Sequence, residues 1–164
     1  MKTIKRRRRE RKTDYKNRFN ILKSGIPRTV FRKTNRYIIG QLVESKEAKD
    51  RVVINVNSKE LLKFGWLWHG SLKSIPAAYL AGRLFAKRAI SKGYKNAILD
   101  LGLLSDVKKS RIYAFVKGVQ DSGVSLRVKE KHYPNEERIN GMHMKKDVKS
   151  KMEEIISKIE HGRD

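Results

Sequence analysis

Residues 74–102 read SIPAAYLAGRLFAKRAISKGYKNAILDLG and place an amphipathic helix immediately before a short apolar strand. Ser74 followed by a proline in the first turn predicts a helix start, and Gly93 predicts that the helix ends near residue 92. Small residues that permit close approach to another surface stand at Ala77, Ala78, Ala81 and Gly82. The apolar run at 95–102 predicts a buried strand. A helix followed directly by a buried strand is typical of an α/β fold.

The segments on either side of this unit extend the same pattern. Upstream, residues 29–34, 37–43 and 51–57 are rich in β-branched residues and joined by short polar connections, which predicts an antiparallel meander. Downstream, Ser110 is placed to cap a helix over 111–121, and a further strand is predicted at 124–128. The predicted order of strand, strand, strand, helix, strand, helix, strand indicates a mixed sheet with helices packed on it, whose second half is parallel.

Shorter elements are predicted around this sheet. Thr13 is placed to cap a short helix that ends at Gly25, and residues 58–65 predict another short, capped helix that ends in glycine. From residue 145 onward, apolar side chains at helical spacing predict an amphipathic C-terminal helix, which docks either on its own domain or on a partner. We therefore expect three segments: a basic arm at 1–12, an α/β domain at 13–128 and a C-terminal extension at 129–164.

The charge of the chain points to a polyanionic partner. Its 164 residues include 40 Lys and Arg against 17 Asp and Glu, a formal net charge of +23, and no cysteine. The missing cysteines exclude disulfides, thiolate metal sites and thiol nucleophiles, and no apolar run predicts a signal peptide or a membrane span. Residues 1–36 hold 15 basic and 2 acidic residues, a net of +13. Nucleic acid is the commonest polyanion that would neutralise such an excess.

The densest cationic segment is residues 5–12 of the arm, which hold no apolar residue to bury and are therefore expected to be disordered alone. An arm that orders along phosphates, a solvated tail and a nuclear localisation signal remain alternatives. Behind it, the first hairpin combines cations with amide, hydroxyl and ring groups suited to RNA. Trp66 is expected to plug the core. The predicted RNA-binding residues are Arg6, Arg7, Arg8, Arg9, Arg11, Lys12, Tyr15, Arg18, Arg28, Arg32, Lys33, Thr34, Asn35, Arg36, Tyr37, Trp68, His69 and Lys73.

Two other function classes are open at this stage. A metal-dependent nuclease would need several carboxylates around two ions, and Asp100, Asp106 and Asp121 are the candidates. The first two strands bring cations and no further carboxylate to meet them, so no catalytic residue, metal or cofactor is predicted. A non-ribosomal RNA-binding or assembly factor is the second alternative. No helix-turn-helix, zinc finger or basic zipper is present, so the usual tools for reading the DNA major groove are missing.

Five stretches together resemble one family along nearly the whole chain. They are residues 28–38 (RTVFRKTNRYI), 75–82 (IPAAYLAG), 97–102 (AILDLG), 115–123 (FVKGVQDSG) and 137–143 (ERINGMH). The chain resembles the large-subunit ribosomal protein family that binds 5S ribosomal RNA, numbered eighteen in the bacterial series and five in the eukaryotic one. The helix at 75–82, the basic arm and the C-terminal extension are similar to its archaeal-type branch.

This resemblance implies a ribonuclease-H-like translational fold without nuclease activity. It implies a cytoplasmic place in the central protuberance of the large subunit, where the protein joins 5S to 23S ribosomal RNA beside neighbouring ribosomal proteins. No membrane, cofactor or small-molecule substrate is implied. In the family the arm and first hairpin contact RNA, which carries over to Arg6 through Arg11 and to Arg28, Arg32, Thr34, Asn35 and Tyr37. The loop at 66–74 departs from the glycine- and asparagine-rich loop that is usual in the family.

Overall fold

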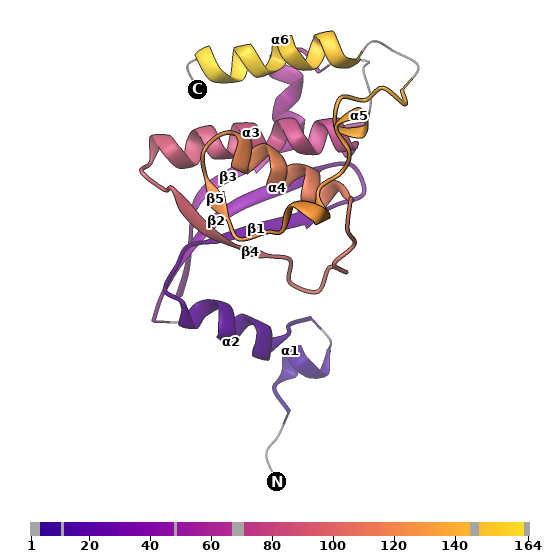
Figure 1. Ribbon diagram of the computed structural model, residues 1–164. Coiled ribbons are helices and arrows are strands. Elements are labelled where there is room, and N and C mark those ends of the chain that lie inside the picture. Colours follow the sequence, from indigo (N-terminus) through magenta and orange to yellow (C-terminus); the bar gives the residue numbers. More distant parts are fainter. Residues whose placement is uncertain (1–3, 11, 48, 67–70, 145–147, 163–164) are drawn as a thin grey trace.

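The computed structural model describes residues 4–10, 12–47, 49–66, 71–144 and 148–162. In chain order the elements are α1 (Arg6–Arg9), α2 (Tyr15–Lys23), β1 (Arg28–Lys33), β2 (Ile38–Lys46), β3 (Lys49–Asn57), the 3-10 helix η1 (Ser58–Phe64), α3 (Ile75–Ser91), β4 (Asn96–Asp100), α4 (Arg111–Asp121), β5 (Ser125–Leu126), the 3-10 helix η2 (Glu130–His132), α5 (Glu136–Ile139) and α6 (Val148–His161). Figure 1 shows α1 and α2 at the opposite end of the molecule from α6.

The strands form one sheet of mixed direction in the order β3-β2-β1-β4-β5. The pairs β1–β2 and β2–β3 are antiparallel, whereas β1–β4 and β4–β5 are parallel. The predicted mixed sheet, its meander and its parallel half are therefore confirmed. The last strand spans only two residues, fewer than the five predicted.

Helices α3 and α4 cover one face of the sheet (Figure 1). Aromatic rings fill the space between the helices and the sheet. Phe115 of α4 packs against Phe31 of β1 and Phe85 of α3, with ring centroids 5.4 and 5.5 Å apart. Gly40 of β2 makes room for this cluster, because a Cβ there would lie 2.5 Å from the Phe115 ring. Trp66 is 1% exposed, which confirms the prediction that it plugs the core.

The crossing of α3 and α4 depends on one glycine from each helix. A Cβ on Gly82 would lie 2.2 Å from the carbonyl oxygen of Phe115, and one on Gly118 would lie 2.2 Å from the carbonyl oxygen of Tyr79. Both collisions are with backbone, which cannot move aside as a flexible side chain could. Of the small residues predicted to permit close approach on α3, Gly82 therefore meets α4.

Gly118→Ala is expected to lower the free energy of unfolding by about 2 kcal/mol, because the added methyl group forces the two helices apart. Urea denaturation of the purified protein measures this. At an exposed helix position the same change would raise the free energy of unfolding by about 1 kcal/mol. A destabilised variant therefore supports the close helix crossing, and a stabilised one contradicts it. Lys117→Ala, next to it on α4 and partly exposed, serves as the control and should change stability by less than about 1 kcal/mol.

The C-terminal helix α6 docks on its own domain. Its apolar residues Val148, Met152, Ile155 and Ile159 are buried, and the helix contacts α3 and η1. An ion pair of 2.5 Å between Arg83 of α3 and Glu160 of α6 closes the far end of this contact. Of the two docking partners left open by the sequence, the structure therefore selects the chain itself.

Candidate nucleic-acid interface

The N-terminal segment presents arginines that the folded domain does not use. Helix α1 has no buried residue. Arg6 pairs with Glu10 at 2.9 Å, and the Nε of Arg7 donates to the hydroxyl of Thr13 at 2.9 Å. Arg8 and Arg9 are exposed and form no ion pair with any residue that the structure describes. The segment expected to lack structure alone thus forms a single helical turn, whose cations face solvent.

Helix α2 links the arm to the first strand of the sheet. Its N-cap is Asp14, whose carboxylate accepts from the amides of Lys16 and Asn17, and not Thr13 as the sequence predicts. Thr13 instead accepts the hydrogen bond from Arg7. A negatively charged aspartate at the N-cap interacts favourably with the positive end of the helix dipole, which explains why Asp14 and not the neutral Thr13 caps α2.

An ion pair fastens the helix to the sheet. Arg18 of α2 contacts Asp50 of β3 at 2.6 Å between Nη2 and Oδ2. The ring of Tyr15, at the start of α2, lies under the ammonium of Lys5, 4.7 Å from its centroid. Phe19 of the same helix is 66% exposed and is available for stacking. The helix therefore presents cationic and aromatic groups on a surface that buries none of its side chains.

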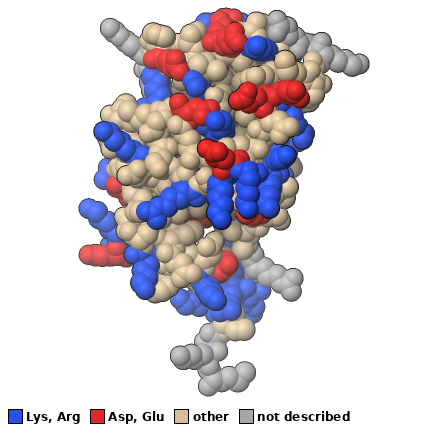
Figure 2. All heavy atoms as spheres, viewed as in Figure 1, with Lys and Arg blue, Asp and Glu red and all other residues tan. Residues whose placement is uncertain are grey.

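A groove of about 340 Å³ separates the arm and α2 from the end of β4. Its cationic lining comes from Arg7, Lys12 and Arg18 on one side and Arg32 of β1 on the other. Leu101 to Leu104 supply backbone and apolar surface, and Asp14 and Asp100 also line it. Lys and Arg side chains gather around this end of the molecule in Figure 2. A groove with four cations from three segments suits a phosphate backbone.

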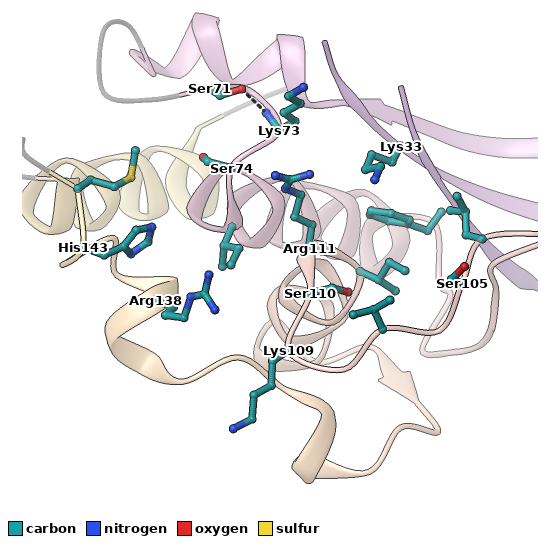
Figure 3. Close-up of a pocket in the computed structure, with 16 residues that line it drawn as sticks. Lys33, Ser71, Lys73, Ser74, Ser105, Lys109, Ser110, Arg111, Arg138 and His143 are labelled. Carbon is teal, nitrogen blue, oxygen red and sulfur yellow. Dashed lines mark hydrogen bonds between the residues drawn. The ribbon is translucent and has the colours of Figure 1, made fainter. Parts of the chain in front are cut away.

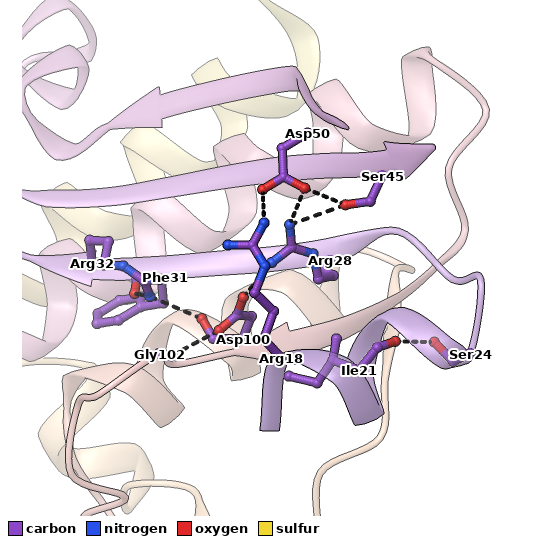
Figure 4. A network of polar contacts seen from close by, with 10 residues as sticks. All are labelled: Arg18, Ile21, Ser24, Arg28, Phe31, Arg32, Ser45, Asp50, Asp100 and Gly102. Carbon is purple, nitrogen blue, oxygen red and sulfur yellow. Dashed lines mark hydrogen bonds and ion pairs between the residues drawn. The ribbon is translucent and has the colours of Figure 1, made fainter. Parts of the chain in front are cut away.

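Arg28 departs from its predicted role, because its guanidinium is used inside the protein (Figure 4). Nη1 contacts the carboxylate of Asp100 at 2.7 Å, and Nη2 contacts that of Asp50 at 2.9 Å. Its side chain is 5% exposed. Asp100 also accepts from the amide of Gly102 at 2.8 Å. Arg28 therefore joins β1, β3 and β4 and does not offer its guanidinium to a ligand.

The same network tunes Asp50. Burial would raise the pKa of this carboxyl, but the hydrogen bond from Ser45 and the charges of Arg28 and Arg18 outweigh burial and lower the pKa below its ordinary value. The lowered pKa keeps Asp50 ionised, so that it holds α2 against the sheet through Arg18.

Arg32, four residues further along β1, keeps its guanidinium available to a ligand. Its Nη1 donates to the carbonyl oxygens of Phe31 at 2.7 Å and Asp100 at 3.2 Å, and the guanidinium lies over Gly102 (Figure 4). A Cβ at Gly102 would come within 2.9 Å of Arg32 Nη2. No carboxylate among the described residues pairs with Arg32, which is only partly buried. Its charge is therefore held in place and left for a ligand in the groove.

The turn after β1 is rigid and its outer side chains are open. The Thr34 hydroxyl donates to the carbonyl of Tyr37 and accepts from its amide, both at 2.9 Å. Between them, Asn35 and Arg36 are exposed and have no hydrogen bond to any described residue. The hairpin thus presents an amide and a guanidinium at its tip.

The remaining predicted residues lie elsewhere. Lys33 points away from the groove, as the alternation of a strand requires after Arg32, and lines a second cleft together with Lys73. Arg11, Trp68 and His69 fall outside the residues that the structure describes. Asn17 and Leu103 also line the groove but were not predicted to bind RNA, because only the fold brings α2 and the segment after β4 to the same groove.

The three carboxylates considered for a nuclease are held by different partners. Asp100 pairs with Arg28, Asp106 accepts from the hydroxyl of Tyr113, and Asp121 accepts from Tyr79 and pairs with Lys117. Within the described ranges, no three His, Asp or Glu side chains are grouped so as to hold a metal ion. The same part of the chain contains no helix long and apolar enough to cross a membrane.

Fold and groove together define a basic α/β protein of the nucleic-acid-binding class. Residues 1–95 match the family model described as ribosomal large subunit proteins 60S L5 and 50S L18. The chain therefore belongs to this family, which is one of ribosomal structural proteins and not of enzymes. The resemblance identified in the sequence is confirmed.

Relatives with the name large ribosomal subunit protein uL18 match most of the chain. The protein of Korarchaeum cryptofilum is 49% identical over 85% of this chain and 70% of its own length. The protein of Methanoculleus marisnigri is 42% identical over 94% of this chain and 87% of its own length. The protein of Caldivirga maquilingensis is 46% identical over 85% of this chain and 67% of its own length. These sources bear out the archaeal-type assignment.

Proposed function

We propose that this chain is a structural constituent of the large ribosomal subunit in the cytoplasm that binds 5S ribosomal RNA and helps attach it to 23S ribosomal RNA, in the central protuberance beside neighbouring ribosomal proteins. Family membership supports the ribosomal role, and the groove between the arm and the sheet is the observation that carries RNA binding. The chain acts by binding and ordering RNA and has no catalytic role, cofactor or small-molecule substrate.

Within this proposal the segments divide the work. Residues 1–12 act as an arm that lies along phosphates, 13–128 form the RNA-binding domain, and 129–164 close the helical side of that domain. We assign direct RNA contact to the members of the predicted set that are exposed, half-buried or groove-lining, which are Arg6, Arg7, Arg8, Arg9, Lys12, Tyr15, Arg18, Arg32, Lys33, Thr34, Asn35, Arg36, Tyr37 and Lys73. Arg28 instead positions the strand on which Arg32 stands.

A gel shift with purified protein tests the proposal. We expect 5S RNA to bind more tightly than an unrelated RNA of equal length at the same salt concentration, since hairpin and groove select shape in addition to charge. Equal affinity for the two RNAs would contradict selection of 5S RNA. Cleavage of labelled RNA in the presence of Mg²⁺ would instead support the nuclease alternative. Native protein that stays free while large subunits sediment would support the non-ribosomal alternative.

Arg32→Ala is expected to weaken 5S RNA binding by about 1–3 kcal/mol, because it removes the fork that the groove holds in place. Arg32→Lys keeps the charge but not the planar fork, so it should recover only part of this loss. Lys59→Ala on η1, an exposed cation away from the groove, is the control. Titration of labelled RNA measures all three proteins. Equal affinities for Arg32→Ala and Lys59→Ala would remove Arg32 from the interface.

A further inference from the structure

A second cleft, of about 590 Å³, opens where the N-termini of α3 and α4 meet the end of β1 (Figure 3). Its lining carries five cations, Lys33, Lys73, Lys109, Arg111 and Arg138. None of these five forms an ion pair with any residue in the described ranges. In Figure 3, Arg111 extends toward Lys73 and Lys33, Arg138 points in from the side of α5, and Lys109 is turned outward. The cleft therefore gathers positive charge that the protein itself leaves unneutralised.

The start of α4 adds hydrogen-bond donors to this charge. Ser110 occupies the N-cap position with extended backbone, but its side chain does not make the capping bond that the sequence predicts. Ser110 lines the cleft, and its hydroxyl oxygen is buried without a hydrogen-bond partner in the described part of the chain. The first-turn amides of α4 likewise have no acceptor there. By contrast, Ser74 caps α3 by accepting from the amide of Ala77. An uncapped helix start beside Arg111 is suited to an anion.

The remaining walls are apolar and leave more room than a bare anion needs. Ile75, Leu104 and Val107 line the cleft, and Val107 is 58% exposed. Clefts of about 300–1,000 Å³ with apolar walls and a few placed polar groups are typical of small-molecule and nucleotide sites. The combination of a cationic, uncapped helix start with an apolar wall matches a phosphate joined to a base.

We propose that this cleft binds one nucleotide of the bound RNA, with its phosphate at the start of α4 between Arg111 and Lys73 and its base against the apolar wall. The inference rests on the proposed RNA-binding function and adds a second contact site to it. RNA is the source favoured by β1, because strand alternation sends Arg32 into the groove beside the arm and Lys33 into this cleft. An RNA strand that passes the tip of the first hairpin would reach both the groove and the cleft.

The first experiment follows backbone amides by NMR in the full chain, with adenosine 5′-monophosphate, inorganic phosphate and adenosine as probes. Adenosine 5′-monophosphate should shift the amides of residues 111–113, more strongly than either probe alone. The double variant Lys73→Gln with Arg111→Gln should weaken this binding about tenfold or more. Lys59→Gln with Lys63→Gln, which removes equal charge from η1, should leave it unchanged. Shifts confined to residues 5–18, or equal binding by both double variants, would overturn the proposal.

The second experiment separates RNA from a free nucleotide as the source. The cleft double variant should flatten the log–log salt dependence of 5S RNA binding by just under about 1 unit relative to the η1 double variant, because the cleft holds one phosphate. A cleft that takes adenosine 5′-monophosphate while the RNA slope is unchanged would overturn the assignment to RNA. If the cleft variant behaves as the control while Arg32→Ala weakens RNA binding, only this inference fails. If the unchanged protein binds 5S RNA no more tightly than an unrelated RNA of equal length, the proposed function fails as well.

Discussion

Asp100→Ala is expected to lower the free energy of unfolding by about 3 kcal/mol, because it leaves the buried guanidinium of Arg28 without its closest carboxylate. The two side chains are 5% and 10% exposed and meet at 2.7 Å. Removing one member of a buried pair typically costs about 3–5 kcal/mol. The lower end is expected here because Asp50 still contacts Arg28 at 2.9 Å. Loss of the bond from the Gly102 amide adds to the effect.

Urea denaturation at neutral pH measures the loss. Glu10→Ala is the matched control, since it removes an exposed carboxylate that pairs with Arg6 and Lys12 and should change stability by less than about 1 kcal/mol. Arg28→Leu combined with Asp100→Leu removes both charges together and should be more stable than Asp100→Ala alone. A loss below about 1 kcal/mol for Asp100→Ala would contradict the role assigned to Arg28 as the tie between strands.

Replacing Arg6, Arg7, Arg8 and Arg9 by glutamine is expected to change RNA binding most. Each phosphate contact contributes just under about 1 unit to the log–log dependence of affinity on salt, so the variant slope should be shallower by about 3 units. The ratio of the affinities of the unchanged protein and the variant for RNA should then increase about 60-fold as KCl falls from about 200 to about 50 mM. The substitution keeps chain length and, because α1 buries no side chain, should leave the stability of the domain unchanged.

The matched control carries four glutamines in place of the exposed lysines Lys59, Lys63, Lys95 and Lys131, which lie outside the groove. It loses the same formal charge, so any difference between the two variants reports position and not net charge. Filter binding of labelled 5S RNA over a salt series measures both. Equal slopes would show that the arm acts only through the general field of the protein, and would remove it from the interface.

Most elements of the fold were predictable because their signals are local. The proline-started helix α3, the glycine that ends it and the alternating residues of the first strands each depend on neighbours a few positions away. The sequence misassigned helix caps where two neighbouring residues can both cap, or where tertiary packing determines whether a cap forms. Asp14 and Thr13 are both capping residues, and Ser110 has the sequence of a cap without making its bond.

The functional surface was less predictable because charge alone does not show where a side chain ends up. Arg28 and Arg32 stand four positions apart on the same strand, and the sequence alone does not distinguish their roles. Arg28 meets carboxylates that lie 22 and 72 positions away in the chain, whereas Arg32 meets only carbonyl oxygens. Arg138 gave no signal of its own, since only folding brings α5 to the cleft at the start of α4.

The sequence by itself determined the class of the protein: a mixed α/β domain with a net charge of +23, concentrated toward the N-terminal arm and first hairpin, and a family resemblance that the comparisons confirm. The tertiary structure alone decided which cations remain available. Burial removes Arg28 from the surface, because a guanidinium taken out of water needs carboxylates around it. The fold leaves Arg32 in the groove and Arg111 in the cleft. No described carboxylate neutralises either charge there, and an RNA phosphate would.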